Sequence, residues 1–442
     1  MRRPVARRSY RRGAVLLLFI TLLLFPLAFL LAVNHSRFLV PAPSNALAAP
    51  PPQPPQPPAL PLPPDRPAPV ASLVAETVPP SPAAAAAAAA TAVAATPLLA
   101  PSEAVPVVLV FCYNRAQYLQ RTLDSLASRA SRSFLNGELH VVVSQDGDNA
   151  EVAEVAARFV SNAATRGLHA EHVRHARDAR QAQLRGGQAA YYLLAQHYGW
   201  ALGMAFDRPS TRRVIILEDD LELAVDFFAY FEAFAPLLDD AEENLLAVSA
   251  WNDHGQPRFV GDPAAFVRAD FFPGLGWMMP RRVWDGQLKQ IWPDSYWDDW
   301  LREPERRRGR QTIRPQVSRV VTFGRDGGAS AGQFFSQYLA PMVLNAKPVD
   351  FSRVDVDALR KRRWDVEFLA AVRGARLSTP DAMRLNGGHE RVEYRGEEGY
   401  RRVCAQLGMM DDIKAGVPRG SYKGVVPLFI AGTNVYVAPD GV

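Results

Sequence analysis

Short apolar runs alternate with stretches of helical periodicity between residues 107 and 217. The runs consist mainly of aliphatic and β-branched residues, which is typical of strands buried on both faces of a sheet. In the helical stretches apolar residues recur every three or four positions, as Leu119, Leu123 and Leu126 do. The expected strands are 107–111, 139–144 and 214–217, with helices through 119–126, 151–160 and 188–204. This alternation predicts an α/β fold with a parallel sheet covered by helices on both faces.

A different pattern follows residue 345. Two alternating segments, 425–430 and 434–437, flank a short Ala-Gly-Thr turn and predict a β-hairpin, with charge-rich helices before it. We therefore expect a main domain at 105–345 and a smaller α+β appendage at 346–442. The sequence assigns no chemistry to the appendage.

An apolar run at 14–33, with Thr21 as its one polar residue, is long enough to span a hydrocarbon layer of roughly 30 Å. Arginines cluster in residues 1–13, and this positive flank favours a cytoplasmic tail with the bulk of the chain on the luminal side. The alternative is a signal peptide cleaved at the Ala-Leu-Ala of 46–48, but that site lies well past the apolar run. We therefore expect an uncleaved transmembrane signal-anchor.

Residues 34–104 form the expected stem. Roughly half of the chain's 37 prolines fall between residues 41 and 106, where aromatic residues are absent and alanine forms a run at 83–90. Such a segment cannot bury a core, so we expect a disordered, partly polyproline spacer.

Composition and charge narrow the functional classes. The chain has 442 residues, 48% hydrophobic and 21% charged, as is ordinary for a globular protein of one or two domains. The net charge of +5 is smaller than the charge of the six N-terminal arginines, so the rest of the chain is close to neutral. This composition gives no footprint for nucleic-acid binding. The two cysteines, Cys112 and Cys404, show no metal-type spacing with histidines.

Three consecutive carboxylates, Glu218, Asp219 and Asp220, follow the expected strand at 214–217. Unpaired carboxylates at the end of a buried strand are costly, and ligands of open α/β sheets bind at the carboxyl ends of strands. A divalent cation that carries a nucleotide diphosphate would suit oxygen ligands at this position. The alternative is an acidic helix start, because a helical pattern begins at Leu221.

Arg115 and Asp146 also come just after expected strands, so they should converge with the three carboxylates on one edge of the sheet. Asp146 would suit a nitrogen-donor edge such as that of uracil, or it is a turn aspartate before Gly147. His197 lies in the expected helix at 188–204, either on its surface or facing the site. The chain lacks a Walker lysine motif, so phosphates would depend on the metal and on arginines.

Two adjacent aspartates, Asp298 and Asp299, lie between tryptophans. Burial against an aromatic wall raises the pKa of a carboxyl group, as a general base needs. The alternative is that both acids pair with nearby arginines, and we expect Asp298 in the site and Asp299 in a structural ion pair. The glycine-rich segment 325–332 predicts a mobile loop in which Ser330 supplies a hydroxyl and backbone amides approach an anionic ligand.

Several motifs stand in an order that resembles the N-acetylglucosaminyltransferase I family, glycosyltransferase family 13. The resemblance runs from about residue 105 to the C-terminus, including 408–418. Besides the carboxylate strand, the motifs are Ser-Ala-Trp-Asn-Asp at 249–253, Phe-Pro-Gly-Leu-Gly-Trp at 272–277, Trp-Asp-Asp-Trp at 297–300 and Gly-Gln-Phe-Phe at 332–335.

This resemblance implies a GT-A (Rossmann-like) catalytic domain at 105–345, with UDP-N-acetylglucosamine as donor and Mn²⁺ as the metal. The implied reaction is inverting β-1,2 transfer of N-acetylglucosamine to the α-1,3-linked mannose of an oligomannose N-glycan. The implied location is the Golgi membrane, as a single-pass type II protein with a luminal catalytic domain. The implied site residues are Asp220 as metal ligand, Asp298 as catalytic base, Glu218 and Asp219 on ribose and sugar hydroxyls, Arg115, Asp146 and His197 on the uridine or phosphates, and Ser330 on the diphosphate.

The sequence departs from the animal members of this family in three ways. Gly147 stands where they have a cysteine that pairs with the position of Cys112, and a second disulfide is also missing. The 325–332 loop is one residue longer and has Ala331 in place of a histidine.

Three other functions deserve comparison. The related transferase that acts on O-mannosyl glycans carries an extra folded domain before its catalytic one, and the expected stem has no such domain. A non-catalytic luminal sugar-binding protein would not need the acids at Asp220 and Asp298. A glycoside hydrolase would have to use Asp298 and Asp299, which are adjacent and should point apart.

Overall fold

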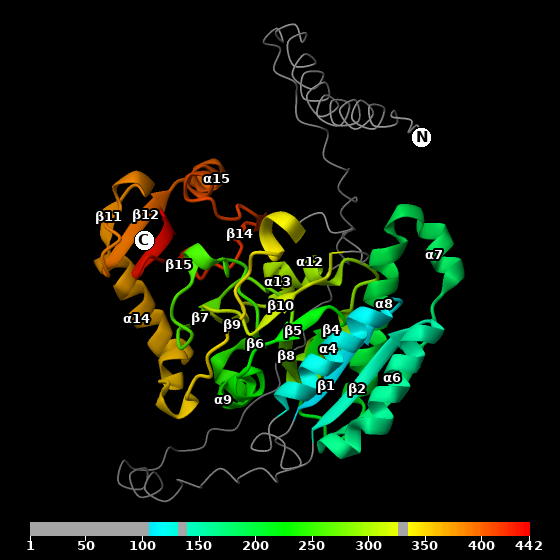
Figure 1. The fold of residues 1–442 in the computed structure, drawn as a ribbon. Helices are drawn as coiled ribbons and strands as arrows, with labels where there is room; N and C mark the ends of the chain where they lie inside the picture. Colours follow the sequence, from blue (N-terminus) through cyan, green and yellow to red (C-terminus); the bar gives the residue numbers. More distant parts are fainter. Residues whose placement is uncertain (1–105, 131–138, 326–334) are drawn as a thin grey trace, which may run out of the picture. The chain divides into compact units, whose positions relative to one another are not determined.

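The apolar run at 107–111 becomes β1 (Val107–Cys112), a central strand of an eight-stranded sheet in the computed structural model (Figure 1). The structure describes residues 106–130, 139–325 and 335–442, all of which lie in one compact unit that spans Ala94–Val442. The expected tail, membrane anchor and stem, and also Ser330, lie outside the described residues. The boundary expected at residue 345 stays a prediction. Among the described residues, no helix is long and apolar enough to cross a membrane.

The large sheet has the strand order β3-β2-β1-β4-β8-β6-β9-β7. Its strands besides β1 are β2 (His140–Asp146), β3 (His169–His175), β4 (Arg213–Glu218), β6 (Leu245–Ser249), β7 (Phe266–Ala269), β8 (Trp277–Pro280) and β9 (Gln311–Pro315). The first four strands in spatial order are parallel, and Val107 of β1 pairs with His140 on one side and Val214 on the other. The strands expected at 139–144 and 214–217 are thus confirmed as β2 and β4.

The prediction of a parallel sheet is wrong for the other half. β8 runs antiparallel to both β4 and β6, and β7 runs antiparallel to β9, whereas β6 and β9 are parallel. Parallel neighbours need a long crossover connection, usually a helix. The regular alternation of strand and helix ends with α9 (Phe227–Asp239), and loops and short helices join the strands that follow. The fold is therefore α/β with a large mixed sheet.

Both faces of the sheet are covered, as the apolar run of β1 predicts. Val108 and Val110 pack into a core with residues of α4, α6 and α9, whereas Leu109 and Phe111 pack into a second core with residues of α8. Alternate residues of a strand point to opposite faces, so a strand between two cores must be apolar throughout. The helices here are α4 (Ala116–Arg129), α6 (Ala150–Ala163) and α8 (Ala189–Phe206), and shorter ones are α7 (Ala179–Arg185), α10 (Arg281–Val283), α11 (Lys289–Ile291), α12 (Trp297–Arg302) and α13 (Pro304–Arg307).

The apolar pattern misses β3 and assigns the wrong structure to β5 (Leu221–Leu223), and the strands β6 to β9 were not expected either. β3 is an edge strand of partly exposed polar residues, so it lacks the aliphatic run of its neighbours. β5 pairs antiparallel with β10 (Val320–Thr322), where the pattern at Leu221 indicated a helix. Because α9 begins only at Phe227, the carboxylates before Leu221 do not start a helix, and the alternative of an acidic helix start is wrong.

The hairpin expected near the C-terminus is confirmed. β15 (Val426–Ile430) and β16 (Thr433–Pro439) pair antiparallel in a four-stranded sheet of order β11-β12-β16-β15. The other elements of this part are α14 (Lys361–Gly374), β11 (Arg376–Ser378), β12 (His389–Tyr394), α15 (Gly396–Leu407), β13 (Ile413–Lys414) and β14 (Val417–Pro418). Cys404 packs in the core of this part and Cys112 in the large core, so the two buried thiols are free.

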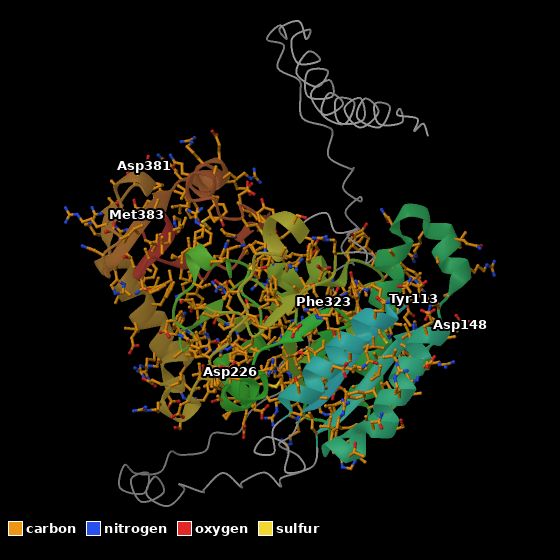
Figure 2. The ribbon with its side chains drawn as sticks, viewed as in Figure 1. Tyr113, Asp148, Asp226, Phe323, Asp381 and Met383 are labelled. Atoms are coloured by element: carbon orange, nitrogen blue, oxygen red, sulfur yellow. The ribbon has the colours of Figure 1, made fainter. Side chains whose placement is uncertain are left out.

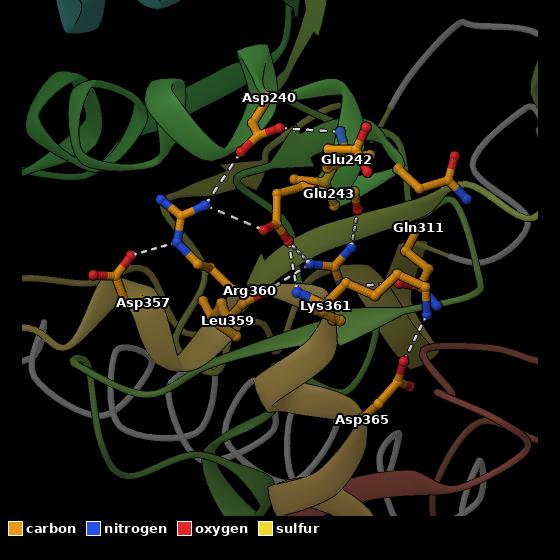
Figure 3. A network of polar contacts seen from close by, with 12 residues as sticks. Asp240, Glu242, Glu243, Gln311, Asp357, Leu359, Arg360, Lys361 and Asp365 are labelled. Atoms are coloured by element: carbon orange, nitrogen blue, oxygen red, sulfur yellow. Dashed lines mark hydrogen bonds and ion pairs between the residues drawn. The ribbon is translucent and has the colours of Figure 1, made fainter. Parts of the chain in front are cut away.

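A buried ion pair between Arg268 and Glu243 also binds the backbone at the start of α14 (Figure 3). Arg268 of β7 is fully buried, and its Nη1 donates to Glu243 Oε2 at 3.0 Å and to the Leu359 carbonyl at 2.7 Å. The backbone amide of Lys361 donates to the same Glu243 Oε2 at 2.6 Å, and Arg360 Nη1 lies 3.3 Å from Glu243 Oε1. Glu243, in the connection between α9 and β6, therefore holds two segments that are far apart in the sequence.

Replacement of Glu243 by alanine should lower the free energy of unfolding by about 3–5 kcal/mol, because it leaves the Arg268 charge buried without its carboxylate. Urea denaturation of the purified protein measures this difference. Glu242→Ala is the matched control, since Glu242 is the exposed neighbour. Equal stabilities of the two variants would contradict the assignment of Glu243 as the residue that joins these segments.

Candidate active site

The carboxyl ends of β1, β2 and β4 meet at one edge of the large sheet. Cys112 at the end of β1 pairs with Gln145, and Phe111 pairs with Glu218 at the end of β4. Figure 2 shows Tyr113 and Asp148, which follow β1 and β2, at this same edge. The convergence expected from the strand pattern is therefore present in the fold.

Arg115 and the three carboxylates form one cluster at this edge. The Arg115 guanidinium pairs with Asp219 through Nη2, and the same nitrogen lies 3.0 Å from Asp220 Oδ2. Glu218 instead accepts a hydrogen bond of 2.7 Å from the hydroxyl of Tyr198 on α8. Thr122 of α4 holds the chain in place, because its hydroxyl donates to the Asp219 carbonyl at 2.8 Å. One guanidinium thus pairs with the two buried aspartates, and Tyr198 binds the third acid.

Burial dominates the electrostatics of these acids. It raises the pKa of Glu218 to about 7, with Asp220 adding to the effect. It raises the pKa of Asp219 to about 6 even though Arg115 acts in the opposite direction. The pKa of Asp220 is also raised by burial against the influence of Arg115. The cluster therefore has an excess of negative charge that a bound cation would offset.

Asp220 has the position and the unused capacity of a metal ligand. Its Oδ1 is buried and accepts no hydrogen bond within the described residues. A Cβ on Gly324 would lie 2.0 Å from Asp220 Oδ2, so only glycine permits this close approach of the backbone. The described residues contain no group of three or more His, Cys, Asp or Glu side chains that could hold a metal ion.

A second cluster surrounds Asp146 and His197. Asp146 Oδ1 lies 2.8 Å from His175 Nδ1, and its Oδ2 lies 3.3 Å from Arg177 Nε. His197 Nε2 contacts Ser144 Oγ at 2.8 Å, and its ring stacks on that of His175 with centroids 5.4 Å apart. Burial lowers the pKa of His197 to about 3, so its imidazole is neutral. His197 is therefore not a helix-surface residue, and Asp146 is more than a turn aspartate.

His175 and Arg177 are the site residues that the sequence analysis missed. His175 ends β3, the edge strand without an aliphatic run, and Arg177 follows it. The one available signal is the repeat of histidine at every third position, 169, 172 and 175. Arg177 also lies over the ring of Tyr113, 3.8 Å from its centroid, which fixes the chain after β1 against β3.

Asp298 and Asp299 lie in the first turn of α12 and both contact Arg302. Arg302 Nη1 is 2.9 Å from Asp298 Oδ2 and 2.8 Å from Asp299 Oδ1. Asp299 has a second cation, Lys414, at 3.2 Å. Burial acts to raise the pKa of Asp299, but Arg302 and Lys414 outweigh it and hold that pKa below its usual range. The alternative that both acids pair with an arginine is correct, and the Asp298 side chain is 40% exposed rather than buried.

Tyr198 connects α12 to the carboxylate cluster. Its ring stacks between Phe111, at a centroid distance of 3.9 Å, and Trp297, at 4.3 Å. Burial raises the pKa of the Tyr198 hydroxyl, and the charges of Glu218 and then Asp298 raise it further. Asp298 is therefore close enough to affect the hydroxyl of Tyr198, which donates a hydrogen bond to Glu218.

Ser330 cannot be placed, because it lies in the segment 326–334 outside the described residues. The chain just before this segment is anchored at the carboxylate cluster, since the amide of Phe323 donates to the Asp220 carbonyl at 2.9 Å. Phe323, which Figure 2 labels, also packs against the ring of Tyr118 and under the Arg121 guanidinium. The predicted role of Ser330 stays a prediction.

Solved structures of nucleotide-sugar enzymes show a partial likeness. The mannosyltransferase PcManGT from Pyrobaculum calidifontis, in complex with GDP-Man and Mn²⁺, matches with a TM-score of 0.32 and 18% identity over 47% of this chain and 54% of that one. GalNAc-T7 with UDP, GalNAc and Mn²⁺ matches with a TM-score of 0.34 and 14% identity over 49% and 44%. This chain thus spans about half the length of these structures, and TM-scores this low support no further conclusion.

Sequence comparison gives a much stronger match. The model of the GNT-I family matches residues 73–442, which includes part of the expected stem. The alpha-1,3-mannosyl-glycoprotein 2-beta-N-acetylglucosaminyltransferase of Arabidopsis thaliana is 40% identical over 344 residues, covering 76% of this chain and 75% of that protein. The family resemblance drawn from the motifs is therefore confirmed, and the chain belongs to the GNT-I family.

Proposed function

We propose that this protein is an inverting glycosyltransferase that transfers N-acetylglucosamine from UDP-N-acetylglucosamine to the α-1,3-linked mannose of an oligomannose N-glycan. The product carries a β-1,2 linkage. This transfer is the first step in the formation of hybrid and complex N-glycans. The observation that carries this proposal is the buried cluster of Glu218, Asp219 and Asp220 at the end of β4, in a chain of this family. Such a cluster suits a donor that arrives with a metal ion.

We assign the large sheet to the GT-A class. The support is the set of parallel strands β3, β2, β1 and β4, whose carboxyl ends bring Arg115, Asp146 and the three acids together. Ligands of open α/β sheets bind at such an edge. The antiparallel strands of the other half then extend the sheet beneath the segments that carry Asp298.

Mn²⁺ is the proposed metal, and Asp220 is its proposed protein ligand. The support is the buried Oδ1 of Asp220, which has no hydrogen-bond partner in the part of the chain that the structure describes, and the close approach of the Gly324 backbone to Oδ2. When bound, such a cation neutralises the charge that develops on the departing diphosphate. Arg115 holds Asp220 in place through its 3.0 Å contact with Oδ2.

The remaining acids and the second cluster would hold the donor. Glu218 and Asp219 offer carboxylate oxygens for ribose and sugar hydroxyls, and Asp146 and His197 lie where the uridine would bind. The neutral imidazole of His197 can accept or donate one hydrogen bond, which suits a base edge or a hydroxyl better than a phosphate. Ser330 is the proposed contact to the diphosphate.

Asp298 is the proposed base of a single displacement. Its carboxylate takes the proton of the mannose 2-hydroxyl as that oxygen bonds to the anomeric carbon. The bond from this carbon to the diphosphate oxygen breaks, UDP leaves, and the configuration inverts. Asp299 is less suited to accept a proton, because Arg302 and Lys414 hold its pKa below the usual range. The same lowered pKa disfavours a glycoside hydrolase, which needs a protonated acid beside the second carboxylate.

Transfer assays with three acceptor conditions test the proposal. The protein would be incubated with UDP-N-acetylglucosamine and Mn²⁺ together with an oligomannose N-glycan, with an O-mannosyl glycopeptide, or with no acceptor. We expect stoichiometric UDP release and glycan mass increase with the oligomannose glycan alone. Preference for the O-mannosyl glycopeptide would identify the related transferase activity, and absence of transfer to either would favour a sugar-binding protein.

We also propose that the protein is a single-pass type II Golgi membrane protein, on the basis of the arginine cluster in residues 1–13 and the apolar run at 14–33. A truncated protein that begins near Val105 should then be soluble and retain full activity, because no proposed site residue precedes it. Membrane sedimentation and transfer assays on both forms measure this. A folded but inactive truncated protein would contradict the separation of stem and catalytic domain.

A further inference from the structure

A depression of about 380 Å³ lies between α12 and the β13–β14 hairpin. Its size is within the range of about 300–1,000 Å³ that small-ligand sites occupy. The residues that matter for its chemistry are Ser295, Tyr296, Asp299, Trp300, Glu303 and Lys414. α12 and β14 lie close together in Figure 1, and the 3.2 Å contact between Lys414 and Asp299 joins the two segments.

Two aromatic rings give the depression apolar surface. Tyr296 is 37% exposed and stacks on Tyr191 of α8 with ring centroids 4.3 Å apart. Its backbone has φ of 50°, a left-handed conformation that is uncommon for a bulky residue. Such conformations persist where the surrounding structure imposes them, often at ligand sites. Trp300 is also partly exposed. The Arg306 guanidinium lies over its ring, with Cζ 5.6 Å from the ring centroid.

Polar groups of both hydrogen-bonding types surround these rings. Asp299 and Glu303 supply acceptors, and Lys414 supplies a donor with a 38% exposed side chain. The hydroxyl of Ser295 is buried and has no hydrogen-bond partner within the described residues. Rings that offer a flat apolar face, with acceptors and donors at the edge, suit the apolar face and the hydroxyls of a neutral sugar.

The depression lies next to the proposed base. Asp299 in its wall and Asp298 contact the same nitrogen of Arg302, at 2.8 and 2.9 Å. A sugar bound here would therefore be within one or two residues, along a glycan, of a mannose that reacts at Asp298. We propose that this depression binds a mannose residue of the acceptor other than the one that receives N-acetylglucosamine. This inference rests on the proposed function.

The proposal gives the C-terminal part of the chain a role in recognition. Lys414 comes from the hairpin between α15 and β15, more than a hundred residues after Asp299. The segment is held firmly, because Arg419 pairs with Asp412 and, at 3.0 Å, with the buried Asp253 of the large-sheet region. A fixed donor on this hairpin would select larger glycans over small ones.

Kinetics with two acceptors test this inference. Lys414→Ala and Tyr296→Ala would be compared with the unaltered protein on a branched oligomannose glycan and on methyl α-mannoside, which has no second mannose to occupy the depression. We expect kcat/KM for the branched glycan to fall about tenfold in each variant, as the loss of one hydrogen bond to a charged group or one ring contact predicts. The kcat/KM for methyl α-mannoside and the KM for the donor should stay unchanged.

Lys289→Ala is the matched control, because Lys289 is a surface lysine whose 2.9 Å ion pair with Asp207 lies outside the depression. It should leave both acceptors unaffected. An equal loss on both acceptors, or no loss on the branched glycan, would overturn the proposal. If the unaltered protein transferred to neither acceptor, the proposed function itself would fail, and this inference would fall with it.

Discussion

Replacement of Asp298 by asparagine lowers turnover by about 10²–10⁴-fold and leaves donor affinity nearly unchanged, if Asp298 is the general base. Asparagine keeps the shape of the side chain and its hydrogen-bonding reach to Arg302 but cannot take up the proton of the acceptor hydroxyl. Donor affinity should persist because the donor would be held by Asp220, Asp219 and Arg115. Steady-state turnover at saturating donor and acceptor, with UDP titration in parallel, measures both quantities.

Asp299→Asn is the matched control, since the two acids are adjacent and contact the same nitrogen of Arg302. Asp299 also pairs with Lys414, so its amide variant should lose thermal stability and retain most of its turnover at saturating acceptor. Because the pKa of Asp299 is held low, its stabilising effect is present above the usual aspartate pKa and is lost only as the pH falls below that range. If Asp299→Asn were inactive and Asp298→Asn active, Asp299 would be the base and Asp298 the structural residue. Loss of no more than a few-fold in either variant would place the base elsewhere.

Replacement of Asp220 by alanine abolishes metal-dependent donor binding and leaves the fold intact. Loss of the only proposed protein ligand should weaken UDP binding in the presence of Mn²⁺ by more than the roughly 10–100-fold seen when supporting residues of metal sites are changed. The melting temperature without metal should be unchanged or higher than that of the unaltered protein. The variant removes one of three acids whose pKa values are raised by burial, and so removes an unfavourable charge from the cluster. Calorimetric titration with UDP, with and without Mn²⁺, measures the difference.

Gly324→Ala should also weaken metal-dependent donor binding, although Asp220 itself is retained. The added Cβ would lie 2.0 Å from Asp220 Oδ2, so the carboxylate or the backbone must move. Gly286→Ala is the control, because a Cβ there meets no atom within 4 Å. Unchanged affinity for UDP and Mn²⁺ in Asp220→Ala would rule out Asp220 as the ligand.

The central strands and most of the donor site were predictable because buried parallel strands have a distinctive composition. β1, β2 and β4 are aliphatic on both faces, so their ends, and with them Arg115, Asp146 and the three acids, could be located from the sequence. β3 lies at the sheet edge and has polar, half-exposed residues, so His175 and Arg177 were missed. The strands β6 to β9 were not expected from the sequence, so the antiparallel pairing of β8 with its neighbours could not be predicted either.

Contacts between distant segments were not predictable. Nothing in the sequence near Lys414 indicates that it meets Asp299, and the stacking of Tyr198 between Phe111 and Trp297 depends on three elements that only the fold brings together. Burial of Asp298 was overestimated for a similar reason. Its tryptophan neighbour Trp297 is buried, but α12 turns the adjacent carboxylate toward the surface.

Determination of the product's glycosidic linkage by NMR tests the central claim most directly. The glycan formed from UDP-N-acetylglucosamine and an oligomannose acceptor would be purified and its new anomeric signal assigned. We expect a β-configured N-acetylglucosamine whose anomeric proton correlates with C2 of the α-1,3-linked mannose. An α-configured product, a linkage to another position, or free N-acetylglucosamine released in step with UDP would contradict the proposed reaction.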